Sequence, residues 1–471
     1  MGVFGVIAEE LGLTHIRDAH SRRDVALLLV SRFIRMAGFG AFAPVLILYL
    51  RHIGFSDRAV GLFLSATLLG DVALSLFVTW TADALGRRRM LALGSTLMAM
   101  SGLVFYSSRN YVLLLLAAIV GIISPSGNET GPFAALEQAM MSQLTVPEGR
   151  VSLLMWYQVL GFVGISAGNT MTGIIVRLTE KQGKSILAAY RGVFLAYAII
   201  AGCKIALSFA MTRHSEIDHP PVPARSAEAS SAPQRSGDGE RQPLLRQNPV
   251  LDPPADLPVP APLPVGRLVA LCLVFSLDSF AGALGPLSFI SYYLKTVHNA
   301  PVQLIAHFFS ITAVIACLSQ LAAGSISKRL GIIGTMVGTH GEALTISSQP
   351  PTPPLTPSLS AAPAQLLTIS FGLAPNLPVA LTLFVARSFL ATMDASVRGA
   401  FLAAVIPKES RTRFLGIINV CKTLAATPGP TVSLTLVSMG YIRYSFVIMG
   451  IIKILYDIAL FIGFKTARLE H

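Results

Sequence analysis

The chain has 471 residues, of which 53% are hydrophobic and 13% charged, and its mean hydropathy is +0.64. This composition excludes an ordinary soluble globular protein and indicates a polytopic membrane protein. The net charge of +12 is explained by positive residues in cytoplasmic loops, with contact to anionic lipid as a further contribution. Nothing in the sequence indicates nucleic-acid binding.

Residues 1–24 form a polar segment that leads directly into the first apolar span, so we expect no cleavable signal peptide and a cytoplasmic N-terminus. Two sets of six apolar stretches follow, each long enough to cross the hydrocarbon core of a bilayer. They lie at about 25–50, 59–82, 89–107, 111–134, 152–176 and 188–212, and then at about 267–294, 304–326, 331–340 joined to 364–374, 377–406, 414–438 and 442–464.

A short polar turn separates the second span from the third and reads Asp83-Ala84-Leu85-Gly86-Arg87-Arg88-Arg89. Three consecutive arginines enter a bilayer only at high cost, so the turn is predicted to lie in the cytoplasm. Because the number of spans is even, both termini then lie on the same side. We expect Asp83, Gly86, Arg87, Arg88 and Arg89 to form gating contacts that break and remake during a transport cycle.

This turn resembles the loop between the second and third helices of the major facilitator superfamily, where an aspartate, a glycine and a basic cluster hold two helix ends together. The resemblance extends over the whole chain apart from the termini, one linker and one insertion. It implies an all-α membrane fold of twelve transmembrane helices in two pseudo-symmetric six-helix bundles. It also implies alternating access to a site near the membrane midplane.

Residues 213–265 are rich in Pro, Ser, Arg and Asp and contain too few large apolar residues to build a core. We interpret them as a disordered cytoplasmic linker between an N-terminal bundle at 25–212 and a C-terminal bundle at 266–466, with 467–471 as a cytoplasmic tail. Within the linker, the sequence from Glu240 to Leu245 resembles an acidic dileucine sorting signal. The plasma membrane and the vacuolar membrane are therefore both expected locations.

The two sets of spans are related as repeats. Tyr49-Leu50-Arg51 matches Tyr293-Leu294-Lys295 at an offset of 244 residues (293 minus 49), and later matches require an offset about twenty residues larger. The extra residues fall at 341–363, a stretch dense in Pro, Ser and Thr that cannot span a bilayer as a helix. We favour a retained intron, which with the sorting signal points to a fungal source; the alternative is a genuine loop in the ninth helix.

Ionisable side chains inside the spans are the informative residues for function, because an unpaired charge at membrane depth costs several kcal/mol and marks a pathway or a pair. Basic groups outnumber acidic ones among them, which favours an anionic or zwitterionic substrate. The candidate proton or substrate sites are Arg32, Arg35, Asp71, Asn128, Glu129, Asp278, Arg387, Asp394 and Arg398.

Asp71 and Asp278 have no opposite charge three or four residues away, so each is expected to pair with another helix, and Arg35 is the expected partner for either. A buried carboxylate beside an arginine can exchange a proton near neutral pH. Asp71, Asp278 and Glu129 are therefore the predicted proton sites.

Other ionisable residues in the spans have structural interpretations. Asp394 with Arg398, and Lys453 with Asp457, are four residues apart and are expected to neutralise each other on one helix face. Lys204 is expected to extend its ammonium group to the membrane interface.

The fifth span contains Gly161, Gly164, Gly168 and Gly173, and the eleventh contains Pro428-Gly429-Pro430. The two segments occupy equivalent positions in the two halves of the chain. They resemble the glycine and proline motif in helix 5 of drug/proton antiporters, although the segment in the fifth span lacks the proline. The alternative is ordinary close packing of helices through small residues.

The sequence contains no zinc-protease helix, no nucleophile elbow and no Cys-x-x-Cys. We therefore expect no enzyme activity, no cofactor and no metal site, and we expect the four cysteines to be small core residues. The favoured function is proton-coupled secondary transport of a small organic solute by a monomer in the lipid bilayer, with export or sequestration ahead of uptake. The alternatives are an uncoupled facilitator, an uptake symporter, and a transport-inactive receptor or scaffold.

Overall fold

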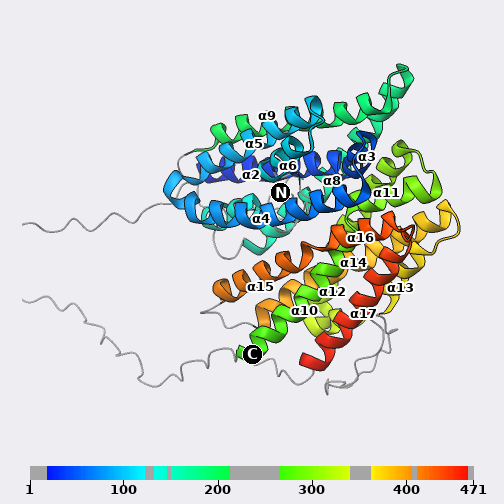
Figure 1. The fold of residues 1–471 in the computed structure, drawn as a ribbon. Helices are drawn as coiled ribbons and strands as arrows, with labels where there is room; N and C mark the ends of the chain where they lie inside the picture. Colours follow the sequence, from blue (N-terminus) through cyan, green and yellow to red (C-terminus); the bar gives the residue numbers. More distant parts are fainter. Residues whose placement is uncertain are drawn as a thin grey trace, which may run out of the picture.

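The computed structural model describes residues 19–121, 123, 132–145, 150–212, 265–339, 362–405 and 411–464, and within these ranges the chain is helical with short turns. The helices gather into two bundles, α2–α9 and α10–α17 (Figure 1). Consecutive short helices combine into single spans, so the described helices make twelve rods, six in each bundle. The predicted all-α fold of two six-helix bundles is confirmed.

The first bundle contains a bent first span and an interrupted fourth span. Pro44 has no backbone N–H to continue a helix, and it separates the two helices of the first span. The bundle consists of α2 (Ala19–Phe42), α3 (Leu46–His52), α4 (Asp57–Leu85), α5 (Arg87–Ser107), α6 (Tyr111–Val120), α7 (Pro132–Leu144), α8 (Arg150–Lys181) and α9 (Ile186–Ala210).

The second bundle also has a divided first span, with Pro286 between its helices, but here the other divided span is the fifth, at Pro428. It consists of α10 (Val265–Leu284), α11 (Leu287–His298), α12 (Val302–Thr339), α13 (Ala362–Gly372), α14 (Leu377–Val405), α15 (Arg411–Ala426), α16 (Gly429–Ser438) and α17 (Tyr444–Phe464).

Membrane-spanning character is clear for much of the described chain, in which seven helical stretches are long and apolar enough to cross a bilayer. One expectation in this region is wrong: the break predicted between the spans at 304–326 and 331–340 is helical, because α12 continues from Val302 to Thr339. The ninth rod is then α13 alone. Residues 340–361 lie outside the described residues, so both interpretations of the 341–363 insertion stay predictions.

The two ends of the molecule differ in how the bundles meet. We call the end that contains the Gly86 turn the arginine-turn end, and the end that contains the turn at Gly54 the opposite end. At the opposite end, Tyr292 of α11 donates a hydrogen bond to the Asp57 carboxylate at 3.0 Å, and Arg51 forms an ion pair with the same carboxylate at 3.0 Å. The hydrogen bond from Tyr292 joins the first bundle to the second, and the ion pair with Arg51 lies within the first bundle.

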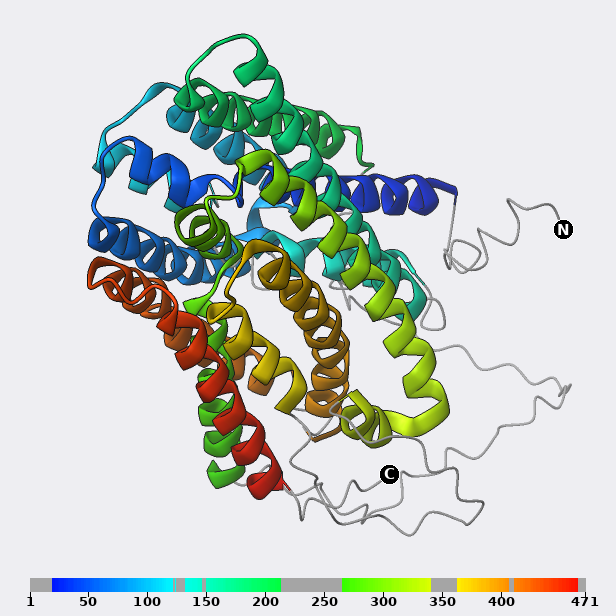
Figure 2. The same cartoon turned by 90° about the vertical axis from the view of Figure 1, so that its right-hand side faces the viewer.

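Hydroxyl pairs continue this junction toward the middle of the molecule. Ser65 of α4 lies 2.6 Å from Thr431 of α16, and Ser310 of α12 lies 2.7 Å from Ser166 and 2.8 Å from Thr170 of α8. Figure 2 shows α12 running along α8. The contact residues occupy the halves of these helices nearer the opposite end, so the bundles are joined there.

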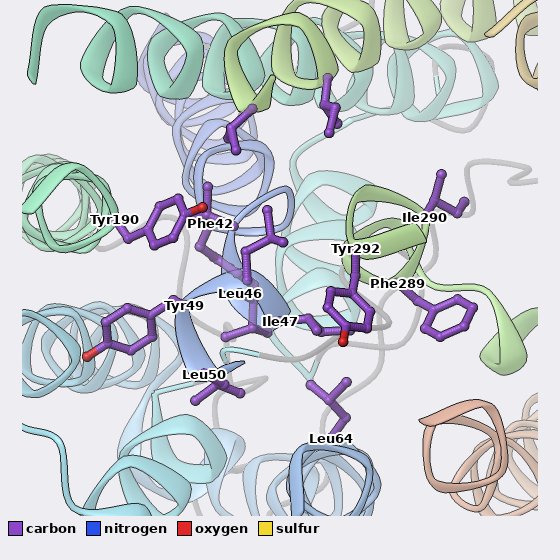
Figure 3. Close-up of a cluster of buried hydrophobic side chains, with 14 of the residues drawn as sticks. Phe42, Leu46, Ile47, Tyr49, Leu50, Leu64, Tyr190, Phe289, Ile290 and Tyr292 are labelled. Carbon is purple, nitrogen blue, oxygen red and sulfur yellow. The ribbon is translucent and has the colours of Figure 1, made fainter. Parts of the chain in front are cut away.

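A shared apolar core supports this junction. Figure 3 shows Leu46, Ile47 and Leu50 of α3 between Tyr190 on one side and Tyr292 on the other, and all five belong to one cluster of buried side chains. Between membrane helices, side chains of this kind stabilise the contact by van der Waals packing. The opposite end is therefore closed by apolar packing as well as by polar contacts.

The repeat relationship is visible in two tyrosines. The Tyr49 hydroxyl donates to the backbone oxygen of Phe105 at 2.7 Å, and the Tyr293 hydroxyl donates to that of Phe371 at 3.1 Å. The tyrosines are 244 residues apart, whereas the two carbonyl groups are 266 apart (371 minus 105). The predicted change in offset therefore occurs between α11 and α13.

Candidate functional site

A fully buried carboxylate lies at the centre of a charged cluster in the first bundle. The Glu137 side chain is 0% exposed. Its Oε2 accepts hydrogen bonds from Arg35 Nη2 at 2.8 Å and from the Tyr157 hydroxyl at 2.7 Å. Its Oε1 accepts one from the Ser31 hydroxyl at 3.3 Å and lies 3.4 Å from Lys204 Nζ. Both oxygens are thus bound by groups from α2, α8 and α9.

Arg32 extends the cluster by one more cation. It is 1% exposed, its Nη2 donates to Gln158 Oε1 at 3.0 Å, and its guanidinium carbon lies 4.5 Å from the centre of the Tyr157 ring. A Cβ at Gly161 would come within 3.0 Å of Arg32 Nε, so the glycine leaves room for the guanidinium. Cation–π contact and a hydrogen bond together offset part of the cost of burying this charge.

We call Arg32, Arg35, Glu137, Tyr157 and Lys204 the Glu137 cluster. Helical spacing explains its assembly, because positions four apart, such as Ser31 and Arg35, lie on one face of α2. Three cationic side chains meet one carboxylate, so the cluster has a net charge of +2 when all four groups are ionised. Burial of unbalanced charge at membrane depth is costly and is typical of functional sites.

The sequence predicted part of this cluster. Arg32 and Arg35 were predicted as candidates and lie in it, but Glu137 was missed, because the fourth span was expected to end near residue 134, whereas α7 runs from Pro132 to Leu144. The signal that could have found it is a single carboxylate within the apolar residues of that helix. The expectation for Lys204 is wrong: its side chain is 3% exposed and faces Glu137, so the ammonium group does not reach the interface.

The second bundle contains a balanced ion pair. Lys453 Nζ of α17 lies 2.7 Å from Asp278 Oδ1 of α10, and Asp457 Oδ2 accepts a hydrogen bond from Gln365 Nε2 at 3.4 Å. The expected pairing of Lys453 with Asp457 is therefore wrong, as is the expectation that Arg35 pairs with Asp278. Spacing of four residues identifies groups that can meet on one helix, but here the neighbouring helix supplies the closer partner.

Two further candidates lie on α4 and α14. Asp71 is 4% exposed and lies near the middle of α4. Arg387 of α14 donates from Nε to Thr368 Oγ1 at 2.9 Å and lies 5.9 Å from the centre of the Phe384 ring. Arg387 thus belongs to the second bundle and is separate from the Glu137 cluster.

The side chains of the remaining candidate residues lie outside the described part of the structure. Asn128 and Glu129 lie outside the described residues. Asp394 and Arg398 are in α14, but their side chains are outside the described set. Their predicted roles, including the pairing of Asp394 with Arg398, stay predictions.

The arginine turn connects α4 to α5 through Gly86, whose φ of 89° is a conformation that favours glycine. Arg87 Nη1 donates to Gln143 Oε1 of α7 at 2.9 Å, and Arg88 Nη2 donates to the Phe209 backbone oxygen of α9 at 3.3 Å. The Asp83 side chain lies outside the described set, and Arg89 is exposed. These contacts bind helix ends within one bundle, so the gating role of the turn stays a prediction.

The glycines of α8 have a packing role. Cβ atoms at Gly164 and Gly168 would collide with the backbone oxygens of Phe33 and Ala37 in α2, and a Cβ at Gly173 would come within 3.0 Å of His307 in α12. Small residues therefore let α8 approach α2 closely. This agrees with the packing alternative, and the resemblance to the antiporter motif stays a prediction.

The cysteines and the described acidic residues give no indication of a metal site. All four cysteines are unpaired, and Cys203 is exposed, so the expectation of a core position is wrong for that residue. Among the described residues, no group of three or more His, Cys, Asp and Glu side chains could hold a metal ion.

Comparisons with known proteins identify the family. The family profile described as Major Facilitator Superfamily matches residues 28–352. The uncharacterized membrane protein YJR124C of Saccharomyces cerevisiae is 30% identical over 442 residues, which cover 93% of each chain. Quinolone resistance protein NorA of Staphylococcus aureus is 28% identical over 102 residues, 22% of this chain and 26% of NorA.

A solved D-xylose-proton symporter has the same fold, with a TM-score of 0.66 at 16% identity over 96% of this chain and 98% of that one. The family profile covers more than half of the chain, and the yeast relative covers nearly all of it. Members of the family are membrane transporters, and this chain is an integral multi-pass membrane protein. It belongs to the major facilitator superfamily.

Proposed function

We propose that the chain is a proton-coupled secondary transporter of small organic anions, which it exports or sequesters by alternating access. The observation that carries this proposal is the net positive Glu137 cluster, buried within membrane-spanning helices. An anionic substrate would offset the surplus positive charge, whereas a cation would add to it.

Arg35 is the proposed substrate ligand. Its Nη2 is engaged with Glu137 and Tyr157, its Nε has no hydrogen-bond partner among the described side chains, and its side chain is 15% exposed. The other charged members of the cluster are 3% exposed or less. The Nε atom is buried, so a substrate would meet the part of the guanidinium that stays exposed, and guanidinium groups bind carboxylates well, which favours carboxylic acids as substrates.

Two observations support export or sequestration. The bundles are joined at the opposite end, so a cytoplasmic arginine-turn end would correspond to a state that receives its substrate from the cytoplasm. The similarity to NorA, a protein named for quinolone resistance, extends over about a fifth of the chain. Both fit movement of the substrate away from the cytoplasm.

Proton coupling requires a carboxylate that gains and loses a proton during the cycle. Asp71, Glu129 and Asp278 are the proposed sites, and Asp278 has a defined partner in Lys453. Protonation of Asp278 would remove its attraction for Lys453 and allow α10 and α17 to separate.

The proposal also includes topology and location. We place residues 213–265 in the cytoplasm as a linker, and we place the monomer in the plasma or vacuolar membrane, with the sequence from Glu240 to Leu245 favouring the vacuole. The turn containing Asp83 and Arg87 is the proposed gate. Neutralising Asp83 should slow flux without preventing membrane insertion, and wild-type flux in an inserted Asp83→Asn protein would contradict the gating role.

The decisive experiment is flux into proteoliposomes that contain purified protein. The labelled probes are benzoate and succinate as anions, glucose as a neutral solute and tetraethylammonium as a cation, each tested with a pH gradient and again with a protonophore. We expect gradient-dependent accumulation of at least one anion and none of glucose or tetraethylammonium. Anion flux that the protonophore does not change would indicate a facilitator, and binding without flux would indicate a receptor.

A matched pair of variants ties this flux to the site. Arg35→Gln should lose anion uptake, while Lys184→Gln, which removes a positive charge from an exposed turn, should retain it. Equal loss in both variants would contradict a specific role for the Glu137 cluster.

A further inference from the structure

We infer that Glu137 is a resident counter-anion of the substrate site, which competes with the carboxylate of the substrate for Arg35 and thereby sets both affinity and the rate of release. This inference rests on the proposed transport of organic anions and assigns a specificity-determining role within that site. Glu137 was not among the residues that the sequence predicted to act there.

The geometry gives Glu137 the position that a bound carboxylate would occupy. Its Oε2 is bound by Arg35 and Tyr157, and its Oε1 is bound by Ser31 and approached by Lys204. These are the charged and hydroxyl donors that recognise carboxylates in proteins. A substrate carboxylate that reaches the exposed part of the Arg35 side chain, which is 15% exposed, therefore meets a guanidinium already shared with another carboxylate.

The charges around Glu137 explain why such a competitor is useful. Arg35 and Arg32 extend from α2, Lys204 from α9 and the Tyr157 hydroxyl from α8. Without the carboxylate, three cations would face the site in a medium of low dielectric constant, where attraction for an anion is strong. A transporter must release its substrate on the other side, so excessive affinity would slow turnover.

A purely structural role for Glu137 makes different predictions. If the carboxylate only stabilised Arg35 and Lys204, its removal would weaken folding and lower the amount of active protein without tightening substrate binding. As a competitor, its removal should tighten binding and slow release. The Michaelis constant and the turnover rate separate the two roles.

The experiment measures KM and turnover for benzoate and succinate in proteoliposomes that contain Glu137→Gln protein. Glutamine keeps the size and one oxygen acceptor but removes the negative charge. We expect KM to fall about tenfold and turnover to fall about tenfold, which corresponds to about 1.4 kcal/mol in each. Glu137→Asp keeps the charge and should stay nearer to wild type, and Lys184→Gln should match wild type.

A charge-restoring variant tests the mechanism more sharply. The double variant Glu137→Gln with Lys204→Met removes one negative and one positive group, so the net charge of the cluster returns to +2. We expect its KM to return to within about threefold of wild type. A KM that stays as low as in Glu137→Gln would overturn the inference, because local contacts and not charge balance would then set the affinity.

The other possible results also test whether Glu137 competes with the substrate. An unchanged or higher KM in monodisperse Glu137→Gln protein would overturn the inference. If that variant cannot be purified, Lys204→Met alone lowers the net charge to +1 and should raise KM about tenfold; an unchanged KM would overturn it. Wild-type protein that carries neither benzoate nor succinate contradicts the proposed function itself, whereas wild-type flux with no change in KM contradicts only the role of Glu137.

Discussion

The two bundles have the same helical frame but different charge distributions. In the first, Lys204 of the sixth span shares Glu137 with Arg35, and Arg32 lies beside them, so positive charge is in excess. In the second, Lys453 of the last span is paired with Asp278 at 2.7 Å. Under the proposed function, the first bundle would recognise an anion and the second would supply the balanced pair for proton coupling.

The parts that the bundles share are structural. Tyr49 and Tyr293 each bind a backbone oxygen near the end of the third span of their own bundle, and each packs against an aromatic ring of the last span, Phe194 and Phe446. Such a contact fixes helix ends without adding charge. Symmetry is thus retained where the frame is held together and absent where charge is concentrated.

The largest effect is expected from removing a positive charge from the Glu137 cluster of the first bundle. Arg35→Gln should lower benzoate or succinate uptake by about 100-fold or more, because it removes the proposed ligand and leaves Glu137 to pair with Lys204. Uptake by proteoliposomes, corrected for the amount of inserted protein, measures this. Activity within tenfold of wild type would show that Arg35 does not bind substrate.

Removing the carboxylate of the ion pair between Asp278 and Lys453 should change the coupling of transport to protons. Asp278→Asn should abolish accumulation driven by a pH gradient while leaving exchange of labelled for unlabelled anion intact, because exchange requires no net proton movement. It should also lower the free energy of unfolding by about 3 kcal/mol, since Lys453 loses its carboxylate partner.

Asp278→Asn combined with Lys453→Met is the control for that change. The double variant should regain much of the lost stability, measured by thermal unfolding, but not the coupling. If the Asp278→Asn protein still accumulates substrate fully in response to a pH gradient, the transported proton must be bound by a residue other than Asp278.

The shared tyrosines offer a smaller and symmetric test. Tyr49→Phe and Tyr293→Phe should each lower the free energy of unfolding by about 1 kcal/mol through loss of one buried hydrogen bond, and neither should change KM. Thermal unfolding in detergent and uptake kinetics measure the two quantities. A large KM change in one variant alone would show that the frame is not functionally symmetric.

The smallest effect is expected from deleting residues 341–363, which should bring the spacing of the two repeats close to 244 residues. The shortened protein should be at least as stable and active as the full chain, since residues 331–340, most of which now end α12, would separate from it and join 364–374 in one continuous span. Sequencing of the transcript tests the intron interpretation directly. Exclusively long messages, together with loss of activity on deletion, would establish a genuine loop.

Part of the site could be predicted because charged residues stand out in apolar spans. Arg32 and Arg35 were identified in this way, but Glu137 was not, since the fourth span was expected to end near residue 134, whereas α7 runs from Pro132 to Leu144. The ion-pair partners of these charged residues were harder to predict than their positions in the spans. Spacing along one helix suggested Lys453 with Asp457, whereas the structure pairs Lys453 with Asp278 across two helices.

The sequence by itself determined that the chain crosses the membrane in two sets of six helices, because long apolar segments in lipid must satisfy their backbone hydrogen bonds internally. It also determined that the spans contain more positive than negative groups. Only the tertiary structure decided where that excess lies. Which cation meets Glu137 depends on the faces that α2, α7, α8 and α9 present to one another, and those faces are set by helix breaks and by close packing at glycines such as Gly164.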